Sequence, residues 1–386
     1  MNLAEVLQGH RVVVCVGSGG VGKTTTAAAL ALRAAVDGRR VLCLTIDPAR
    51  RLATSLGLDE MTTEERVVPM ALFEAQGLKP KGELSAMMLD TKRTFDELVE
   101  RYASSPEARD RILNNEIYRY VSSSLAGTQE YMAMEKLHAV RQNDRWDLIV
   151  LDTPPTTNAL DFLDAPERLV AMIDSPAMRW FVQAFQGAGK MSFNLLGKGA
   201  AFLLKGISQF TGGEFLANIA EFVTGLNELF GGFRERAATI SESLRKPDVA
   251  FVVVTSPAPM AVREAIFFAR RLESAGLADS GFVVNGMRPL LHEPSVPRSE
   301  LLAELTKLLP PGADVEAALT RLENALDDER LLAVGDRIES DRLRSQVGED
   351  RLVVEVPAFD QDVHDLRALT EVADYLVGKR QMEAIS

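Results

Sequence analysis

Residues 11–25, RVVVCVGSGGVGKTT, decide the fold of this chain. A valine-rich run passes directly into a glycine-rich turn, and an Ala- and Leu-rich stretch, TAAALALRAA, follows it. The run predicts a buried strand, and the stretch after the turn predicts a helix. The turn itself matches G-x-x-x-x-G-K-[ST] in the strand–loop–helix context that this pattern requires. The segment therefore predicts a loop that holds phosphate groups.

Each part of this loop has a role in phosphate binding. Glycines let successive backbone N–H groups point at phosphate oxygens, and the helix N-terminus adds a partial positive charge. We expect Lys23, a candidate catalytic residue, to pair with the β- and γ-phosphates of a nucleotide, and the Thr24 hydroxyl to ligate Mg²⁺. The residues expected to bind the nucleotide are Gly19, Gly20, Val21, Gly22, Lys23, Thr24 and Thr25.

A dinucleotide site is the rival interpretation of the same loop. Gly17, Gly19 and Gly22 form a nested G-x-G-x-x-G, and Asp47 ends the next predicted strand, where a dinucleotide-binding fold has its ribose ligand. The rival is the weaker one because a dinucleotide loop does not need consecutive Lys-Thr-Thr at its helix start, whereas phosphoryl transfer uses both groups there.

Five further apolar runs predict strands along the rest of the chain. With the first, the predicted strands span residues 11–16, 40–46, 147–151, 249–255, 281–285 and 351–356. The runs are continuous rather than alternating, which is typical of strands buried on both faces of a parallel sheet. We therefore expect an α/β fold, a doubly wound and mostly parallel sheet flanked by helices, in one P-loop NTPase domain over residues 1–386.

Two long gaps between the predicted strands must hold several helices, and we expect helical insertions at residues 89–142 and 178–232. The second insertion contains eight phenylalanines and only seven charged side chains. Its apolar face has three alternative uses: packing on the domain core, forming a groove or lid for a hydrophobic client helix, or lying on a membrane surface. Charged residues at helical spacing over residues 316–350 predict a solvated helix.

Two aspartates that follow predicted strands are candidates for metal and water chemistry. Asp152 ends DLIVLD, and a carboxylate beside the phosphate loop can hold Mg²⁺, the Walker B role. Asp47 precedes Pro48, which favours an extended backbone, so that its side chain projects from the strand end. We expect Asp47 to position the water that attacks the γ-phosphate and to join Thr24 and Asp152 at the metal. Alternatively, Asp152 caps a helix or turn, and Asp47 is a ribose contact or turn residue.

The overall charge argues against two classes of partner. The chain has 43 Lys and Arg against 55 Asp and Glu, a net charge of -12, and no run of five or six basic residues. This balance does not favour binding to nucleic acid or to an anionic membrane surface. Cys15 and Cys43 fall inside predicted strands, which favours buried core residues over metal ligands or a disulfide.

The sequence also predicts a cytoplasmic protein. No uncharged apolar run approaches the roughly 18 residues that indicate a membrane-spanning helix, so we expect no stable membrane span. The N-terminal residues lack the basic and apolar regions of a signal peptide.

Three motifs occur in order: the loop at residues 17–25, DPA at residues 47–49 and DTPPT at residues 152–156. With the segment TSPAPMAVREA at residues 255–265, they resemble the ArsA-like anion-pump and tail-anchored-protein-targeting ATPases, within the deviant-Walker-A class that includes MinD and ParA. The resemblance covers most of the chain. It implies a Mg²⁺-dependent ATPase, with ATP and Mg²⁺ as cofactors, that acts as a nucleotide-switched homo-dimer or hetero-dimer and binds a hydrophobic client segment.

The resemblance also implies roles for single residues. Asn285 matches the family asparagine that reads adenine, and Pro357 and Phe359 lie in a segment that matches the adenine loop. Asp47 falls in switch I, where it would position or activate water, and residues 152–160 form switch II. Two other functions remain open: a nucleotide-dependent scaffold with very slow turnover, and a small-molecule kinase with Asp47 as its base.

Departures from the family pattern limit these expectations. The second loop residue of the family is normally a lysine that reaches across a dimer to the partner's phosphates, and here it is Ser18. We therefore expect slow basal turnover or a partner that donates the cation, because such cations are worth roughly 10³–10⁵ in rate. Switch II has Asn158 where close relatives often carry histidine. The sequence also lacks the closely spaced cysteines of arsenite capture and a C-x-x-C zinc clasp, so we do not expect an arsenite pump subunit.

Overall fold

The computed structural model describes residues 2–46, 51–58, 63–116, 118–119, 122, 128–153, 160–176, 222, 235–277, 279–291 and 296–382. The chain divides into two compact units. The first, here called the sheet unit, comprises residues 1–87, 145–159 and 247–386. The second, the helical unit, comprises residues 88–144 and 160–246.

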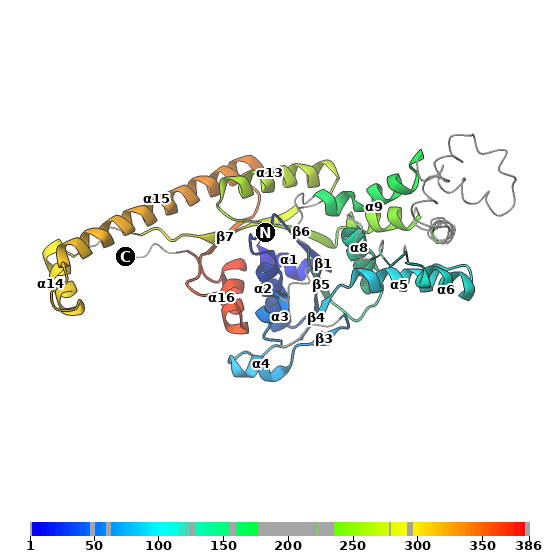
Figure 1. Ribbon diagram of the computed structural model, residues 1–386, viewed down its shortest axis with the longest axis horizontal. Coiled ribbons are helices and arrows are strands. Elements are labelled where there is room, and N and C mark those ends of the chain that lie inside the picture. The colour runs from blue at the N-terminus through cyan, green and yellow to red at the C-terminus, as the bar shows by residue number, and fades with distance from the viewer. Residues whose placement is uncertain are drawn as a thin grey trace, which may run out of the picture. The chain divides into compact units, whose positions relative to one another are not determined.

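An eight-stranded sheet is the centre of the sheet unit, with the strand order β3-β4-β2-β5-β1-β6-β7-β8 (Figure 1). The strands are β1 (Val12–Val16), β2 (Arg40–Thr45), β3 (Arg66–Val67), β4 (Glu83–Met88), β5 (Leu148–Asp152), β6 (Val249–Thr255), β7 (Asp279–Met287) and β8 (Val353–Pro357). The six strands from β2 to β8 in this order pair in parallel, whereas β3 is antiparallel to β4. Strands that follow β1 in the chain lie on both sides of it, which is the doubly wound topology.

The predicted fold class is confirmed. All six predicted strands form, and each of their ends agrees with the structure within two residues. The prediction missed β3, which has two residues, and β4, whose sequence ELSAMM contains no β-branched residue and therefore gives a weak strand signal. Four residues of β4 are nevertheless buried, because the strand lies inside the sheet between β3 and β2.

Among the residues that the structure describes, the sheet unit contains eight helices. They are α1 (Leu3–Gly9), α2 (Lys23–Val36), α3 (Arg51–Ser55), α4 (Met70–Ala75), α13 (Pro259–Ser274), α14 (Arg298–Leu308), α15 (Val315–Val347) and α16 (Leu366–Leu376). Figure 1 shows α13 and α15 along one side of the sheet and α1, α2 and α16 along the other. The sheet is therefore covered by helices on both faces.

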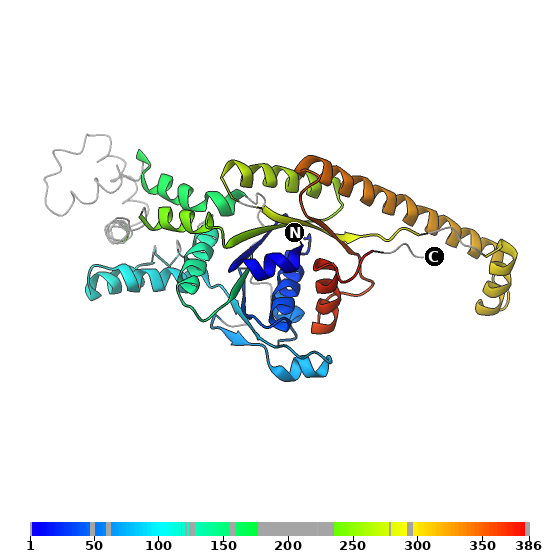
Figure 2. The ribbon, with the colours of Figure 1, turned by 180° about the vertical axis from the view of Figure 1, so that it is seen from behind.

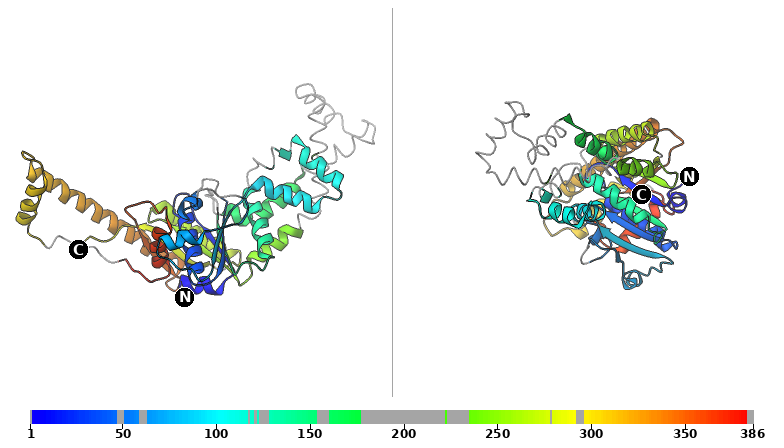
Figure 3. Two further views of the ribbon diagram at one scale, coloured as in Figure 1. Left: turned by 90° about the horizontal axis from the view of Figure 1, so that it is seen from below. Right: turned by 90° about the vertical axis from the view of Figure 1, so that its right-hand side faces the viewer.

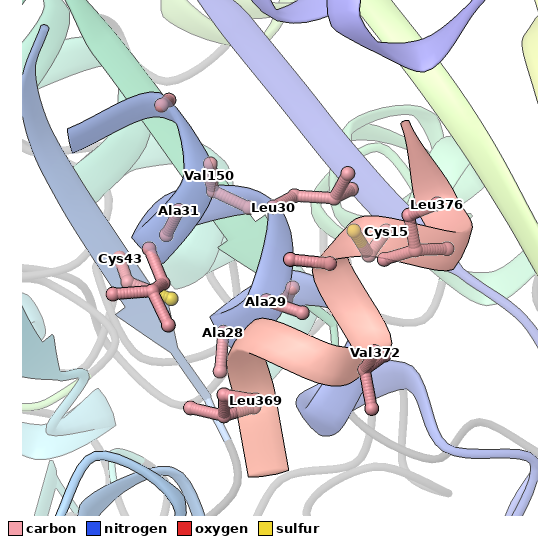
Figure 4. Packing of buried hydrophobic residues seen from close by; sticks show 14 of the residues in the cluster. Cys15, Ala28, Ala29, Leu30, Ala31, Cys43, Val150, Leu369, Val372 and Leu376 are labelled. Atoms are coloured by element: carbon pink, nitrogen blue, oxygen red, sulfur yellow. The ribbon is translucent and has the colours of Figure 1, made fainter. Parts of the chain in front are cut away.

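The core beneath the phosphate loop is built around α2. This helix buries a run of small alanines together with Leu30 and Leu32, and it packs on β1, β2 and β5. Figure 4 shows Leu369, Val372 and Leu376 of α16 packed against it, with Cys15 and Cys43 in the same buried cluster. Because both sides of α2 are packed, its N-terminus is held in a fixed position at the carboxyl ends of the strands.

The longest helix, α15, has 33 residues, and Asp314 caps it by accepting a hydrogen bond from the backbone N–H of Ala317 at 3.0 Å. The charge pattern of residues 316–350 predicted this helix. Its C-terminal half packs on α13 and β7, and α14 packs against its N-terminal part, as Figures 2 and 3 show. Apolar side chains remain exposed on it, such as Leu331, which is 71% exposed.

The helical unit contains α5 (Thr91–Tyr102), α6 (Pro106–Asn114), α8 (Thr128–Arg141), α9 (Leu160–Ile173) and a helical segment at residues 235–244. Its packing includes buried polar pairs. The Tyr131 hydroxyl donates to Glu135 at 2.6 Å, Arg236 bonds to the same carboxylate at 3.3 Å, and its guanidinium lies 3.7 Å from the ring centroid of Tyr102. These contacts join the helix at residues 235–244 to α5 and α8.

The predicted apolar insertion, residues 178–232, lies outside the described residues except for Phe222, whose side chain is buried. Among the described residues, no helix has the length and apolar character that crossing a membrane requires.

Candidate functional site

The phosphate loop connects β1 to α2 and packs onto the ends of two neighbouring strands. At Gly17, a Cβ atom would lie 2.0 Å from the carbonyl oxygen of Val254 on β6. At Gly22, which caps α2 with a φ of +93°, a Cβ atom would lie 2.2 Å from Nδ2 of Asn285 on β7. No side chain fits at either position. The two glycines thus allow the loop backbone to touch β6 and β7 directly.

Lys23 is the first residue of α2 and is only 6% exposed. Its Nζ donates a hydrogen bond to the backbone carbonyl of Ser18 at 2.7 Å. The ammonium group therefore lies across the loop that precedes it, at the N-terminus of α2, where the helix dipole also favours an anion. The structure thus gathers two sources of positive potential at one loop.

Asp152 connects the loop to the neighbouring strands. The carboxylate is fully buried at the end of β5, where the parallel register sets it beside Cys15 of β1 and Thr45 of β2. Its Oδ2 accepts hydrogen bonds from the hydroxyls of Thr24 at 2.8 Å and Thr45 at 2.9 Å. The predicted metal pair, Thr24 and Asp152, is therefore in direct contact. Thr45 was not among the predicted site residues, although its position at a strand end just before Asp47 is a usable signal.

These oxygens suit a hard divalent cation. A hydroxyl and a carboxylate are the ligand types that Mg²⁺ takes in phosphate-loop sites, where it keeps several waters and adds few protein ligands. Among the described residues, no group of three or more His, Cys, Asp or Glu side chains could hold a metal. The residues present at the loop fit Mg²⁺ held together with a nucleotide.

The expected adenine residues lie along β7 and β8. Asn285 donates from Nδ2 to the carbonyl of Val21 in the phosphate loop at 3.0 Å. Pro357 ends β8, and the ring of Phe359 packs edge-on against Tyr375 of α16, with centroids 6.2 Å apart. Pro357 and Phe359 both line a cavity of about 1210 Å³, which also contacts Arg288. Asn285 and the phosphate loop do not line this cavity, so it brings together only two of the three expected adenine residues.

Several predicted residues cannot be placed. Asp47 and the rest of the DPA motif, and residues 154–159 of switch II with Asn158, lie outside the described residues. Thr153 is described, and its hydroxyl donates to the carbonyl of Cys15 at 2.8 Å, which ties the start of switch II to β1.

The two cysteines are core residues in the structure. Both thiols are free and buried, and burial raises the pKa of each, with the nearby Asp152 carboxylate adding to the effect. Thiols held protonated in this way are poor ligands for soft metals, which bind thiolates. The interpretation of Cys15 and Cys43 as core residues agrees with this environment.

A comparison with known families identifies the class to which this loop belongs. The family model described as anion-transporting ATPase matches residues 10–300, about three quarters of the chain. The chain belongs to the anion-transporting ATPase family. The matched segment includes the phosphate loop, Asp152 and Asn285, whereas most of α14, α15, β8 and α16 follow it. The resemblance predicted from the motifs is confirmed.

Curated relatives are similar at modest identity. The chain is 28% identical to an "ATPase GET3" of Malassezia globosa over 159 residues, 41% of this chain and 43% of that protein. It is 27% identical to an "ATPase get3" of Schizosaccharomyces japonicus over 181 residues, 46% of this chain and 52% of that protein. An "ATPase GET3" of Mycosarcoma maydis is 28% identical over 155 residues. The chain spans about half the length of the curated relatives it matches.

Proposed function

We propose that this protein is a Mg²⁺-dependent ATPase in which nucleotide binding and hydrolysis switch a dimer between two states. One observation carries the proposal: the hydroxyl of Thr24 and the carboxylate of Asp152 meet at 2.8 Å, next to the buried Lys23. A kinked glycine loop alone binds many anions, but this pairing adds the two metal-binding groups of a phosphoryl-transfer site. Membership of the anion-transporting ATPase family supports the same chemistry.

Each residue of the loop would act on the phosphates. Lys23 would leave the carbonyl of Ser18 for the β- and γ-phosphate oxygens, which are stronger acceptors because they are charged. The backbone N–H groups at the start of α2 would bind the same oxygens. Together they stabilise the negative charge that gathers on the phosphates in the transition state.

Thr24 and Asp152 would hold Mg²⁺, with Thr45 keeping the Asp152 carboxylate oriented through its hydroxyl. When bound, the ion would neutralise phosphate charge. Asp47 would position the attacking water, in the role that the resemblance gives it. Asn285, Pro357 and Phe359 would hold the base.

The dimer and the client are further parts of the proposal. Because Ser18 replaces the family lysine, basal turnover would be slow unless a related partner chain donates the cation that crosses the dimer. The apolar insertion at residues 178–232 would bind a hydrophobic helical client, since it is rich in phenylalanine and poor in charge, with eight phenylalanines and seven charged residues. Phe222 is buried, so we expect this one phenylalanine to pack inside the protein and not to contact the client.

A matched pair of substitutions at Thr24 tests the metal arrangement. Thr24→Ala removes the hydroxyl that contacts Asp152, and we expect it to abolish the gain in ATP affinity that Mg²⁺ provides. Thr24→Ser keeps the hydroxyl and should retain most of that gain. Calorimetric titration of ATP with Mg²⁺ or with EDTA measures the difference. An unchanged Mg²⁺ effect in Thr24→Ala would contradict the assigned metal site.

A further inference from the structure

Asn285 contacts the phosphate loop itself, 264 residues away in the sequence. Its Nδ2 donates to the carbonyl of Val21 at 3.0 Å, and a Cβ atom on the next residue, Gly22, would lie 2.2 Å from the same nitrogen. The Asn285 amide therefore contacts two consecutive loop residues. We propose that Asn285 is a positioning residue for the phosphate loop, holding the backbone at Val21 and Gly22 in the curve that binds phosphate. This inference rests on the nucleotide site proposed above.

The carbonyl of Val21 needs such a donor. A loop that turns its N–H groups toward a phosphate turns carbonyls away from it, where they must find other partners. Val21 is only 4% exposed, so the Asn285 amide supplies a partner in a place with little access to water. Because a carbonyl only accepts, the nitrogen of the amide, and not its oxygen, must face Val21.

The hydrogen-bonding capacity of one amide allows two roles at once. A carboxamide has two N–H donors and one carbonyl acceptor. The bond to Val21 uses one donor, which leaves one donor and one acceptor. That is the pair with which an asparagine reads adenine at N7 and N6. The same side chain can therefore contact the base and hold the phosphate loop, so that loss of Asn285 weakens binding at both ends of the nucleotide.

The end of β7 is well placed to act as a rigid support. The register with β8 shifts between Asn285 and Met287, and Gly286 adopts a φ of +78° at this bulge. Two residues further on, the backbone N–H of Arg288 donates to Asp336 of α15 at 3.0 Å, and its guanidinium bonds the same carboxylate at 3.1 Å. The strand end is thus tethered on the side away from the loop.

Tripolyphosphate has no base, so its binding can separate the positioning role of Asn285 from any role in base recognition. Affinities for ATP and for tripolyphosphate, both with Mg²⁺, would be measured by calorimetry for the wild type, Asn285→Ala and Asn285→Asp. The second variant keeps the size of the side chain but replaces the donor with a carboxylate, whose negative charge also repels phosphate. We expect Asn285→Ala to weaken tripolyphosphate binding roughly tenfold, the effect of leaving one buried carbonyl unpaired, and Asn285→Asp to weaken it further. Phe359→Ala, which leaves the Asn285–Val21 hydrogen bond in place, should weaken ATP binding and leave tripolyphosphate binding unchanged.

Hydrogen exchange of the ligand-free protein gives an independent readout. The peptide that contains residues 17–25 should exchange faster in both Asn285 variants than in the wild type and in Phe359→Ala. Unchanged tripolyphosphate affinity together with unchanged exchange in the Asn285 variants would overturn the inference and leave the proposed function intact. A wild type that binds neither ATP nor tripolyphosphate would overturn both. If the wild type binds ATP but binds tripolyphosphate too weakly to measure, hydrogen exchange of residues 17–25 alone tests the inference: faster exchange in the Asn285 variants supports it, and unchanged exchange overturns it.

Discussion

Lys23 is a buried cation whose position is set by its own loop. Burying an ammonium group is costly unless hydrogen bonds or opposite charge compensate, and here the Ser18 carbonyl accepts a hydrogen bond from it. The residue that would meet the phosphate is therefore already oriented at the N-terminus of α2. Ser18, in contrast, contributes its backbone and not a charged side chain.

The missing lysine at position 18 has a direct test. Ser18→Lys restores the cation that the family carries there, and we expect it to raise ATP turnover at least tenfold, a part of the roughly 10³–10⁵ that a cation supplied across a dimer provides. Ser18→Met, of similar length but uncharged, is the control and should not raise the rate. Steady-state phosphate release measures both. No gain in Ser18→Lys would show that another group already supplies the charge.

At the residue scale, the sequence nominated candidate residues but not their contacts. Lys23 and Thr24 come from the loop motif and Asp152 from a strand end, and the structure brings the last two together. The sequence could not show that Thr45 bonds to Asp152 or that Asn285 bonds to Val21, because these contacts depend on strand order and register. Register between distant strands is fixed by tertiary packing and leaves no local pattern.

At the scale of elements, α2 depends on its packing against α16. Leu369 is fully buried between them, and Leu369→Ala should lower the free energy of unfolding by about 2–5 kcal/mol, since it removes a buried side chain and leaves a cavity. Leu331→Ala makes the same change at a site that is 71% exposed and should cost no more than about 0.5 kcal/mol. Urea unfolding measures both. Equal losses would contradict the assigned core.

The starts of β2 and β5 are joined by an ion pair that predicts a pH dependence. Arg40 donates to Asp147 from its backbone and its guanidinium, which lowers the pKa of Asp147 to about 2. A carboxyl with a lowered folded pKa stabilises the fold above its unfolded pKa of about 3.9, and this contribution is lost as the pH falls toward 2.

We therefore expect Asp147→Asn to flatten the fall in stability between about pH 4 and pH 2, with a small effect because the pair is partly exposed. Arg40→Gln removes the principal cause of the shift and should do the same. Urea unfolding across this pH range measures the slope. A slope equal to that of the wild type in both variants would show that the pair does not contribute.

Strands and helices were predicted where the pattern lay within their own residues. Continuous apolar runs predicted six strands, and charge spacing predicted α15. β4 was missed because burial inside the sheet, and not β propensity, makes ELSAMM a strand. The bulge at Asn285 was also missed, since it arises from the pairing of β7 with β8.

At the scale of the whole molecule, the sheet unit carries all the described site residues. The helical unit is held together by polar pairs of its own, such as Lys136 with Glu97 at 3.0 Å. The proposed switching would require the nucleotide at the loop to bias one arrangement over another. One of the chain connections between the two units lies between residues 159 and 160, a few residues after the proposed metal ligand Asp152.

The most direct test of the ATPase proposal is phosphate release from ATP and Mg²⁺ by the purified chain, with no acceptor molecule present. We predict that the wild type forms ADP and inorganic phosphate in equal amounts, and that Lys23→Ala, which removes the buried ammonium beside the phosphates, loses this activity. A kinase would need an added acceptor, and a scaffold would bind ATP without release. Phosphate release that is absent from the wild type, or undiminished in Lys23→Ala, would contradict the proposal.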